Sequence, residues 1–363
     1  MKYSIIVPVY NRPDEVDELL ASLEAQTFDD FEVVIVEDGS TIPCMDVVNR
    51  HASRLALRYF AKENGGPGPS RNFGAERCQG EFLIVLDSDC VLPPGYMAAV
   101  EEELRRDDCD AFGGPDAAHE SFTDVQKAIS YSMTSFFTTG GIRGGKKQLD
   151  RRFYPRSFNM GVRAELWKRL GGFSSMRFGE DIDFSIRIYK YGARCRLFPC
   201  AWVWHKRRTD WRKFFKQVHN SGIARINLMK RHPGSLKLVH LLPMCFTVGT
   251  FGLLAVAVLS LLLAIMGVVT MLLTSGCING PLLCIIAGLV GCLLALAPLL
   301  LYSSAIAVDS GIRNGSVKVG LLSVPASFIQ LIGYGTGFVR AWWLRCVCGR
   351  NEELQAFKEN FYE

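Results

Sequence analysis

The feature that most constrains the fold of this chain is a long apolar stretch, Leu238 to Leu273, that contains no Asp, Glu, Lys or Arg. A helix needs about 20 such residues to cross the hydrocarbon core of a bilayer. A second apolar stretch, Leu282 to Val308, follows a short uncharged turn, and a weaker one runs from Val319 to Val339. We therefore predict α-helical transmembrane segments within residues 236–340, two spans and a weaker third candidate, followed by a tail over residues 341–363.

Basic residues precede the first stretch and follow the second, where Arg313 and Lys318 lie. Because Lys and Arg are enriched in cytoplasmic loops, both of these ends should be cytoplasmic. Three full spans would place the arginines of the tail outside, against this tendency. Either the third segment is re-entrant or interfacial, or this chain departs from the enrichment of Lys and Arg on the cytoplasmic side. We expect a multi-pass protein of the cell inner (plasma) membrane with its N-terminal globular domain in the cytoplasm.

Residues 206–235 connect the globular part to the apolar stretches and carry a helical pattern. Large apolar side chains recur on one face of the expected helix, and basic side chains lie off that face. The pattern is typical of an amphipathic helix in a membrane interface, and the alternative is a surface helix packed on the globular domain. The apolar residues are Trp211, Phe214, Phe215, Val218, Ile226 and Met229, and the basic ones are Arg212, Lys213 and Lys216.

Composition separates the two halves of the chain. The hydrophobic fraction is 49% over 363 residues, and the excess falls after Gly234, so residues 1–205 are predicted to form a globular domain. A net charge of +5 is modest and gives no indication of nucleic-acid binding. The 12 cysteines are scattered, and the chain opens on a strand-like run without a signal peptide. We therefore expect free thiols in a reducing cytoplasm.

Short apolar runs alternate with helical patterns in the N-terminal part, which predicts an α/β fold with a mainly parallel sheet covered on both faces. Acidic residues follow the second and fourth runs, as Glu37-Asp38 and as Asp87-Ser88-Asp89. Ligands of α/β sheets bind outside the carboxyl ends of the strands, so both acidic clusters should lie at one edge. The expected strands are Tyr3–Val9, Phe31–Val36, Leu57–Phe60 and Phe82–Leu86.

Asp87 and Asp89 are the candidate metal ligands, because Mg²⁺ and Mn²⁺ prefer carboxylate oxygens and often share them with substrate phosphates. The alternative is a solvated acidic turn. His205 is a further candidate ligand of the metal or a diphosphate, and the alternative is a structural histidine. Arg71 opens a helix after a loop rich in Gly and Pro that lacks a P-loop or dinucleotide fingerprint. It either reaches a nucleotide or is an exposed residue at a helix start.

Three acids, Glu180, Asp181 and Asp183, crowd the first turn of a later helix. The helix dipole alone favours one or two acids there. The third makes a catalytic carboxylate a reasonable hypothesis, because a general base has to lie within hydrogen-bonding reach of an acceptor hydroxyl.

Several motifs in this order resemble the family-2 glycosyltransferases with a GT-A fold, and the apolar tail is similar to that of their membrane-anchored bacterial members. The resemblance implies a Rossmann-like catalytic domain that transfers a sugar, with inversion, from a nucleotide-diphosphate sugar in the presence of Mg²⁺ or Mn²⁺. The motifs are Val7-Pro8-Val9-Tyr10-Asn11, Val36-Glu37-Asp38-Gly39-Ser40, Ser70-Arg71-Asn72-Phe73-Gly74-Ala75, Asp87-Ser88-Asp89, Asn159-Met160-Gly161-Val162 and Gly179-Glu180-Asp181-Ile182-Asp183.

The resemblance also implies roles for single residues. Asp87 and Asp89 would be the Asp-x-Asp motif, with Asp89 as the direct metal ligand. Asp181, after Glu180, matches the family's catalytic base, and His205 lies where some relatives have a metal- or diphosphate-contacting histidine. Glu37 stands where the family often has an aspartate. The nucleotide pocket would be lined by Pro8, Tyr10, Glu37, Asp38, Arg71 and Asp87.

The Gln-x-x-Arg-Trp motif of processive synthases is absent, so we expect one sugar to be added per acceptor. The expected partners are a nucleotide-sugar donor, a lipid-linked or membrane-proximal glycan acceptor and membrane lipids, in the assembly of cell-surface polysaccharide or glycolipid. Two alternatives remain open. The acceptor is a bare polyprenyl phosphate, or the chain is a membrane protein that binds nucleotide-sugars without turning them over.

Overall fold

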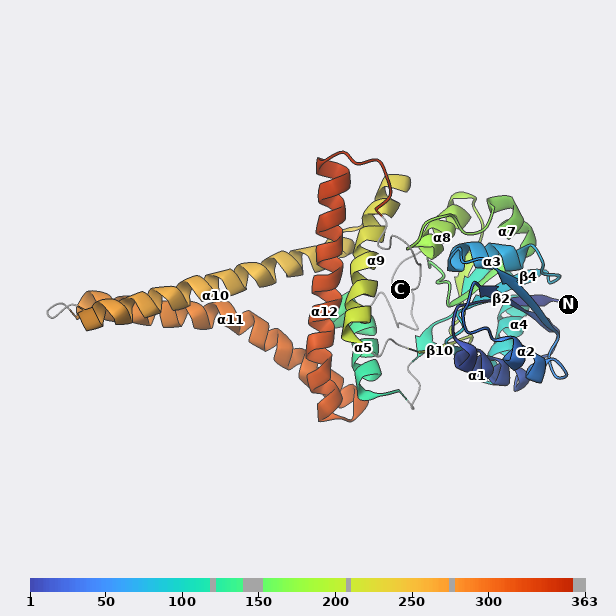
Figure 1. The fold of residues 1–363 in the computed structure, drawn as a ribbon, viewed down its shortest axis with the longest axis horizontal. Helices are drawn as coiled ribbons and strands as arrows, with labels where there is room; N and C mark the ends of the chain where they lie inside the picture. The colour runs from blue at the N-terminus through green and yellow to red at the C-terminus, as the bar shows by residue number, and fades with distance from the viewer. Residues whose placement is uncertain (118–121, 140–152, 207–209, 274–277, 355–363) are drawn as a thin grey trace.

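The computed structural model describes residues 1–117, 122–139, 153–206, 210–273 and 278–354. An α/β domain lies at one end of the molecule, and a pair of long helices projects from the other end (Figure 1). A layer of helices lies between them.

The central sheet has the strand order β3-β2-β1-β4-β8-β6-β9. β3, β2, β1 and β4 are parallel, whereas β8 runs antiparallel to both of its neighbours, β4 and β6. The prediction of a mainly parallel sheet is therefore confirmed, and its four predicted strands are present. The strands are β1 (Tyr3–Val9), β2 (Phe31–Asp38), β3 (Leu57–Lys62), β4 (Phe82–Leu86), β6 (Ala111–Gly113), β8 (Asn159–Arg163) and β9 (Cys195–Leu197).

Helices cover both faces of this sheet, which is why β1, β2 and β4 are apolar without alternation. Alternate residues of β2 enter different cores, so that Val33 and Ile35 pack with one set of helices and Val34 faces the other side. One face carries α1 (Pro13–Glu24), α2 (Met45–His51) and α4 (Tyr96–Arg106), and the other carries α3 (Pro67–Ala75), α7 (Ala164–Leu170) and α8 (Glu180–Lys190).

A second, small sheet has the order β5-β10-β7. Its strands are β5 (Cys90–Val91), β7 (Asp116–Ala117) and β10 (Val203–His205). Strands this short carry no periodic signal, and the sequence analysis did not predict β5 or β7. The pairing matters because it sets His205 opposite Cys90, next to Asp89.

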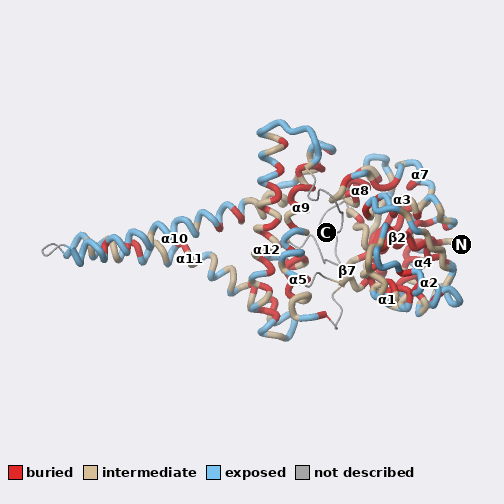
Figure 2. Tube along the Cα trace, viewed as in Figure 1, coloured by how far each residue is buried: buried red, intermediate tan, exposed pale blue. Residues whose placement is uncertain are grey.

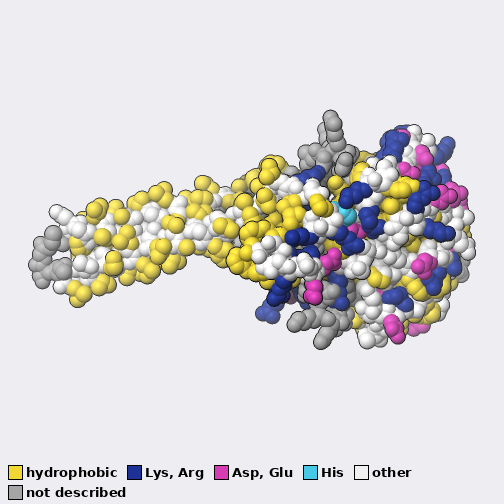
Figure 3. Space-filling model, turned by 90° about the horizontal axis from the view of Figure 1, so that it is seen from above, with side chains coloured by type: hydrophobic (Ala, Val, Ile, Leu, Met, Phe, Trp, Pro, Cys, Tyr) yellow, Lys and Arg dark blue, Asp and Glu magenta, His cyan; other side chains and the backbone are white. Residues whose placement is uncertain are grey.

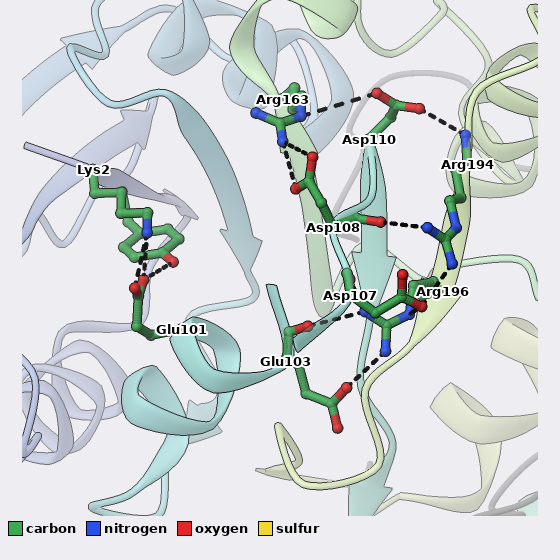
Figure 4. Close-up of polar contacts among 10 residues, drawn as sticks. Lys2, Glu101, Glu103, Asp107, Asp108, Asp110, Arg163, Arg194 and Arg196 are labelled. Carbon is green, nitrogen blue, oxygen red and sulfur yellow. Dashed lines mark hydrogen bonds and ion pairs between the residues drawn. The ribbon is translucent and has the colours of Figure 1, made fainter. Parts of the chain in front are cut away.

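Ion pairs join the amino end of β6 to β8 and β9 (Figure 4). Arg163 donates to both oxygens of Asp108 at 2.5 and 2.6 Å, and Arg196 lies 2.8 Å from Glu103. This edge is opposite the one at which Asp87 follows β4, because β8 runs from Asn159 beside Leu86 to Arg163 beside Phe82. Asp108 is therefore an acid outside the candidate site, and exposed pairs of its kind contribute only about 0–1 kcal/mol to stability.

The apolar stretches form three long helices that have the length and composition to cross a membrane. Two of them, α10 (Leu242–Leu273) and α11 (Asn279–Asn314), pack together as the projecting hairpin. Their outer residues are exposed yet apolar (Figures 2 and 3). A surface of this extent is expected to face lipid.

The third long helix, α12 (Val317–Trp342), crosses the base of the hairpin at a steep angle (Figure 1). It runs beside α9 (Trp211–Arg231) and α5 (Asp124–Thr134), and η2 (Trp343–Val347) continues it. This arrangement explains why α12 is more buried than either hairpin helix.

The apolar face of α9 packs on α12 and α5, which neither sequence hypothesis anticipated. Phe214 and Val218 lie in one core with Ile129 of α5, and Ile226 lies in another with Phe338 of α12. α5, from the predicted globular domain 1–205, thus packs in the helical layer, and the boundary at residue 205 stays a prediction. The membrane-interface location of α9 stays a prediction.

Glycines allow the backbones of α9 and α12 to approach closely. A Cβ on Gly337 would lie 2.0 Å from the His219 carbonyl oxygen, and one on Gly222 would lie 2.1 Å from that of Tyr334. Small residues at such crossings are typical of membrane helices.

We expect Gly337→Leu to destabilise the α9–α12 pair by about 1–3 kcal/mol or more, because backbone cannot move aside as a side chain can. Unfolding of the full chain in detergent measures the effect. Gly252→Leu on α10 is the matched control, since no atom lies within 4 Å of its added Cβ. Equal unfolding midpoints for the two variants would contradict the close packing.

Candidate functional site

The carboxyl ends of the parallel strands form the floor of the candidate site. Pro8, at the end of β1, is buried beside Val36 of β2, and Tyr10 follows at the rim. Asn11 has φ 52° and joins the two loops, since its side-chain oxygen accepts from the amides of Thr41 and Ile42 at 2.8 and 2.9 Å. The sheet therefore brings the first two predicted motifs to one edge.

Arg71 lies at the centre of the site. Its guanidinium donates to Asp87 at 2.7 Å and to Glu180 at 3.1 Å, and it lies over the ring of Phe173. It is only 3% exposed, so the exposed helix-start alternative is wrong. A buried arginine held by two carboxylates joins the Asp-x-Asp loop to the start of α8.

A second group of side chains gathers around Asp89. One of its oxygens accepts from Arg12 at 2.7 Å, and the other lies 3.1 Å from Nε2 of His205. The same nitrogen lies 3.9 Å from Asp87. Carboxylate and imidazole donors thus converge on one point, as the ligands of a Mg²⁺ or Mn²⁺ ion would.

Cys90 also lies in this group, but its chemistry is different. Its Sγ, a ring nitrogen of His205 and an oxygen of Asp89 lie within 4.8 Å of one another. Burial raises the pKa of the Cys90 thiol well above its ordinary value, whereas only a thiolate is a good metal ligand. The donor set is therefore two carboxylates and one imidazole, which fits a hard divalent cation.

The structure adds residues that sequence reasoning missed. Asp116 of β7 lies 4.0 Å from Nδ1 of His205, and Phe158 stacks on the imidazole ring at 4.9 Å. At 4.0 Å, Asp116 adds negative charge beside the second ring nitrogen without a hydrogen bond to it, and the stacked Phe158 ring restricts the orientation of the imidazole. The turn signal Gly113-Gly114-Pro115 before Asp116 was visible, but its spatial relation to His205 depends on the short β7–β10 pair.

Glu37 and Asp38 have structural partners at the same edge. Glu37 is 2% exposed, and its oxygens accept from Ser40, the amide of Cys44 and Tyr59. Its carboxylate thus holds the loop after β2 from beneath, and the predicted nucleotide contact of Glu37 stays a prediction. Asp38 accepts from Lys62 and from the amides of Gly65 and Gly66, and so fixes the Gly-rich loop.

The three acids of α8 point to three different partners. Glu180 accepts from Arg71, Asp181 lies 3.4 Å from Arg156, and Asp183 accepts from Arg187 at 2.9 Å. Asp183 is fully buried and faces away from the site, whereas Asp181 is partly exposed. Each acid therefore has a specific side-chain contact in addition to its favourable place at the start of the helix.

The environment of Glu180 changes its acidity. Burial, and then the negative charge of Asp181, raise the pKa of Glu180 to about 7, although Arg71 acts in the opposite direction. Ionisable groups with such shifts are concentrated in functional sites. A carboxyl of this kind exchanges its proton near neutral pH.

Asp183 joins α8 to the end of α9. His232 lies 2.8 Å from one Asp183 oxygen, and Arg231 lies 3.2 Å from it. Burial opposes ionisation of Asp183, but the His232 hydrogen bond and the arginine charges hold its pKa below the ordinary value. This contact therefore holds the first turn of α8, which carries the acids of the candidate site, against the end of α9.

We expect Asp183→Asn to lower the free energy of unfolding by about 3 kcal/mol at pH 7, because a buried ion pair loses its charge. A carboxyl with a lowered pKa stabilises the fold above the unfolded-state pKa of about 3.9, and that stabilisation is lost as the pH falls through the folded-state pKa. Denaturant unfolding should therefore show a full difference from the unsubstituted chain at pH 6–7 that shrinks below about pH 4. Asp108→Asn is the control, and a difference independent of pH would contradict the ionic role.

Parts of the chain are similar in sequence to known glycosyltransferases. The family model described as Glycosyl transferase family 2 matches residues 4–169. TarS of Staphylococcus aureus, a poly(ribitol-phosphate) beta-N-acetylglucosaminyltransferase, is 42% identical over 93 residues, which are 24% of this chain and 16% of TarS. The pre-mycofactocin glycosyltransferase of Mycobacterium tuberculosis is 28% identical over 236 residues, 63% of this chain and 48% of that protein. The matches thus span less than half of these curated relatives.

Among solved structures, the mannosyltransferase PcManGT from Pyrobaculum calidifontis, in complex with GDP-Man and Mn²⁺, has a TM-score of 0.53. It is 17% identical, and the match covers 90% of this chain and 86% of that one. The likeness shows a shared fold.

Proposed function

Given that this chain is a family 2 glycosyltransferase with the GT-A fold, we propose that it moves one sugar from a nucleotide-diphosphate sugar to an acceptor at the cytoplasmic membrane face, with inversion of the anomeric carbon. One observation carries the proposal. Arg71 joins Asp87 of the Asp-x-Asp loop to Glu180 at the start of α8, at the sheet edge where nucleotides bind in such folds.

Asp87, Asp89 and His205 would hold a Mg²⁺ or Mn²⁺ ion. When bound, such an ion stabilises the negative charge that develops on the departing nucleoside diphosphate. The complex of PcManGT with GDP-Man and Mn²⁺ supports this assignment. Arg71 and Arg12 orient the carboxylates of Asp87 and Asp89, at 2.7 Å each, before donor and metal arrive.

Asp181 is the proposed general base. It would accept the proton of the acceptor hydroxyl as that oxygen attacks the anomeric carbon from the face opposite the leaving group. Glu180 is fixed by Arg71, and because its pKa is raised to about 7 it gains or loses a proton beside Asp181 near neutral pH. The step is a direct displacement and needs no activated water, unlike the paired-carboxylate chemistry of glycoside hydrolysis.

The acceptor is proposed to be lipid-linked or membrane-proximal, in cell-surface polysaccharide or glycolipid assembly. TarS and the Bacillus spizizenii relative are named as enzymes that transfer N-acetylglucosamine and glucose to poly(ribitol-phosphate), a polymer that contains phosphate. The membrane-compatible helices next to the site favour an acceptor presented at the bilayer. A bare polyprenyl phosphate is the alternative, and it would attack through an already ionised oxygen.

Within the membrane, we propose that the α10–α11 hairpin crosses the bilayer and that α12 does not. The start of α12 and the η2 segment that continues it both contact helices that adjoin the catalytic domain. Lys318 of α12 lies 2.8 Å from Asp124 of α5, and Arg345 of η2 donates to Asn227 of α9 at 2.8 Å. Tyr131 of α5 also donates to Asp309 near the end of α11. The hairpin would thus leave and return to the catalytic side, with the basic tail on that side as well.

We expect Cys348, in the tail, and Cys200, in the catalytic domain, to be labelled from the same side of the membrane. Both thiols are exposed. Variants that retain one of them, with serine at the other cysteines, would be treated with a membrane-impermeant maleimide. Labelling of both in inside-out vesicles, and of neither in right-side-out vesicles, is the expected result. Labelling of Cys348 only in right-side-out vesicles would show that α12 crosses the membrane.

Nucleotide release tests the proposed activity. Detergent-solubilised full chain would be given Mn²⁺ and a panel of UDP- and GDP-sugars, with and without membrane lipid extract. Release of nucleotide from one donor, increased by the extract, is expected. Tight donor binding without release, even with extract, would favour a protein that binds nucleotide-sugars without turnover.

A further inference from the structure

A group of basic side chains lies between the catalytic domain and the membrane helices. We name it the basic junction, and it consists of Arg156, Arg225, Lys237 and His240. They come from four segments: the approach to β8, helix α9, the linker after α9, and η1 (Leu238–Leu241), which leads into α10. The backbone N–H of Lys237 donates to Nδ1 of His240 at 3.0 Å, and the Lys237 ammonium lies 5.8 Å from the centre of the Tyr154 ring, two residues before Arg156. Arg225 contacts Tyr334, which packs in one core with Leu236 and Leu241 on either side of Lys237 and His240. The four residues therefore lie around one place in the fold.

The basic junction adjoins the proposed base. Arg156 lies 3.4 Å from a carboxylate oxygen of Asp181. Nε of Arg225 lies 3.4 Å from the Tyr334 hydroxyl of α12, and in the described part of the chain no carboxylate lies within 4 Å of this guanidinium. Partly buried guanidinium groups without a carboxylate are suited to bind an anion from outside the chain.

The surroundings of the junction are apolar on the membrane side. Leu238 and Leu242, which flank His240, are 83% and 58% exposed. Figure 3 shows Lys and Arg side chains gathered where the apolar hairpin meets the globular domain. A ligand that matches this surface has a negatively charged head and a long apolar chain.

We propose that the basic junction binds the phosphate or diphosphate group of a lipid-linked acceptor and presents its acceptor end to Asp181. The inference rests on the proposed function, because it assigns the acceptor side of that site. Arg225 and Lys237 would contact the phosphate oxygens, and Arg156 would connect the phosphate site to the base. The lipid chain would leave along Leu238 and Leu242 toward α10.

The test measures lipid binding without donor, so that it is independent of catalysis. Full chain in detergent micelles would be mixed with polyprenyl phosphate, with uncharged polyprenol, or with phosphatidylglycerol, and bound lipid would be counted by native mass spectrometry. The test variant is Arg225→Gln with Lys237→Gln. The matched control is Arg212→Gln with Lys230→Gln, which removes the same charge from exposed positions of α9.

We expect the unsubstituted chain and the control to retain polyprenyl phosphate in preference to both other lipids. The test variant should bind polyprenyl phosphate about tenfold more weakly or worse. Each charge-assisted hydrogen bond contributes about 1.5–3 kcal/mol, and 1.4 kcal/mol is a tenfold change in affinity. Excess inorganic phosphate should not displace polyprenyl phosphate. The unfolding midpoint of each variant shows whether it is folded. If the double variant does not fold, Lys237→Glu, at an exposed position of the linker, takes its place as the test variant.

Equal binding of phosphatidylglycerol would overturn the proposal in favour of a general contact with anionic lipid. Unchanged binding in the test variant, or displacement by inorganic phosphate, would overturn it as well. The two proposals fail separately, because nucleotide release from the donor reports on the function and lipid retention reports on the junction.

Discussion

Asp181→Asn is expected to lower the rate of sugar transfer by about 10²–10⁴-fold, the usual contribution of a general base. The amide keeps the size of the side chain and its place at the start of α8, but it cannot accept the proton of the acceptor hydroxyl. The transfer rate at saturating donor measures the effect. Donor affinity should change little, since Arg71 contacts Asp87 and Glu180 and not Asp181.

The same substitution distinguishes the two acceptor classes. With a bare polyprenyl phosphate the attacking oxygen is already ionised, so a base is dispensable and Asp181→Asn would retain full activity. Loss of the Asp181 charge should also lower the pKa of Glu180 toward its ordinary value, because that charge helps to raise it. The pH dependence of the residual rate would shift to lower pH accordingly. Asp108→Asn, outside the site, controls for a general loss of charge.

Asp89→Ala is expected to reduce nucleotide release by about 10³-fold or more, since a metal ion contributes several kcal/mol of charge stabilisation and each 1.36 kcal/mol is a factor of ten. The substitution removes the acid that lies 3.1 Å from His205 and 2.7 Å from Arg12. Chelation of divalent ions in the unsubstituted chain should produce a similar loss, and Mn²⁺ or Mg²⁺ should restore it.

Two results would count against the metal site. One is full nucleotide release in the presence of a chelator, and the other is restoration of Asp89→Ala by the Mn²⁺ concentration that suffices for the unsubstituted chain. Asp108→Ala is the matched control, because it removes an exposed acid from the opposite edge of the sheet. His205→Ala should show a smaller loss, as two carboxylates would remain.

The strands of the central sheet that are continuous apolar runs could be predicted from the sequence. Phe82–Leu86 is buried on both faces and is recognisable without any neighbour, as are β1 and β2. The strands that complete the site are two or three residues long, so their pairing depends on tertiary contacts. The position of His205 follows from the β5–β10 pair, which no local pattern encodes.

The sequence could indicate which residues form the candidate site, but not which side chains they contact. The resemblance pointed to Arg71, Asp87 and Glu180, yet Arg71 and Glu180 are 109 residues apart, and only the folded chain shows that one guanidinium joins both acids. Glu37 is a second case, since its motif position gave no indication that its buried carboxylate also accepts from the amide of Cys44. Composition likewise identified α12 as apolar, but hydropathy does not show a helix that lies across the base of a hairpin.

The most direct test follows the sugar itself. Inside-out membrane vesicles containing the chain would receive the radiolabelled nucleotide-sugar that supports release, and label would be followed into lipid extracted with organic solvent. We expect one sugar per acceptor in the lipid fraction, absent with Asp89→Ala and absent in right-side-out vesicles. Label that remains in water as free sugar, with none in lipid, would contradict transfer to a membrane acceptor.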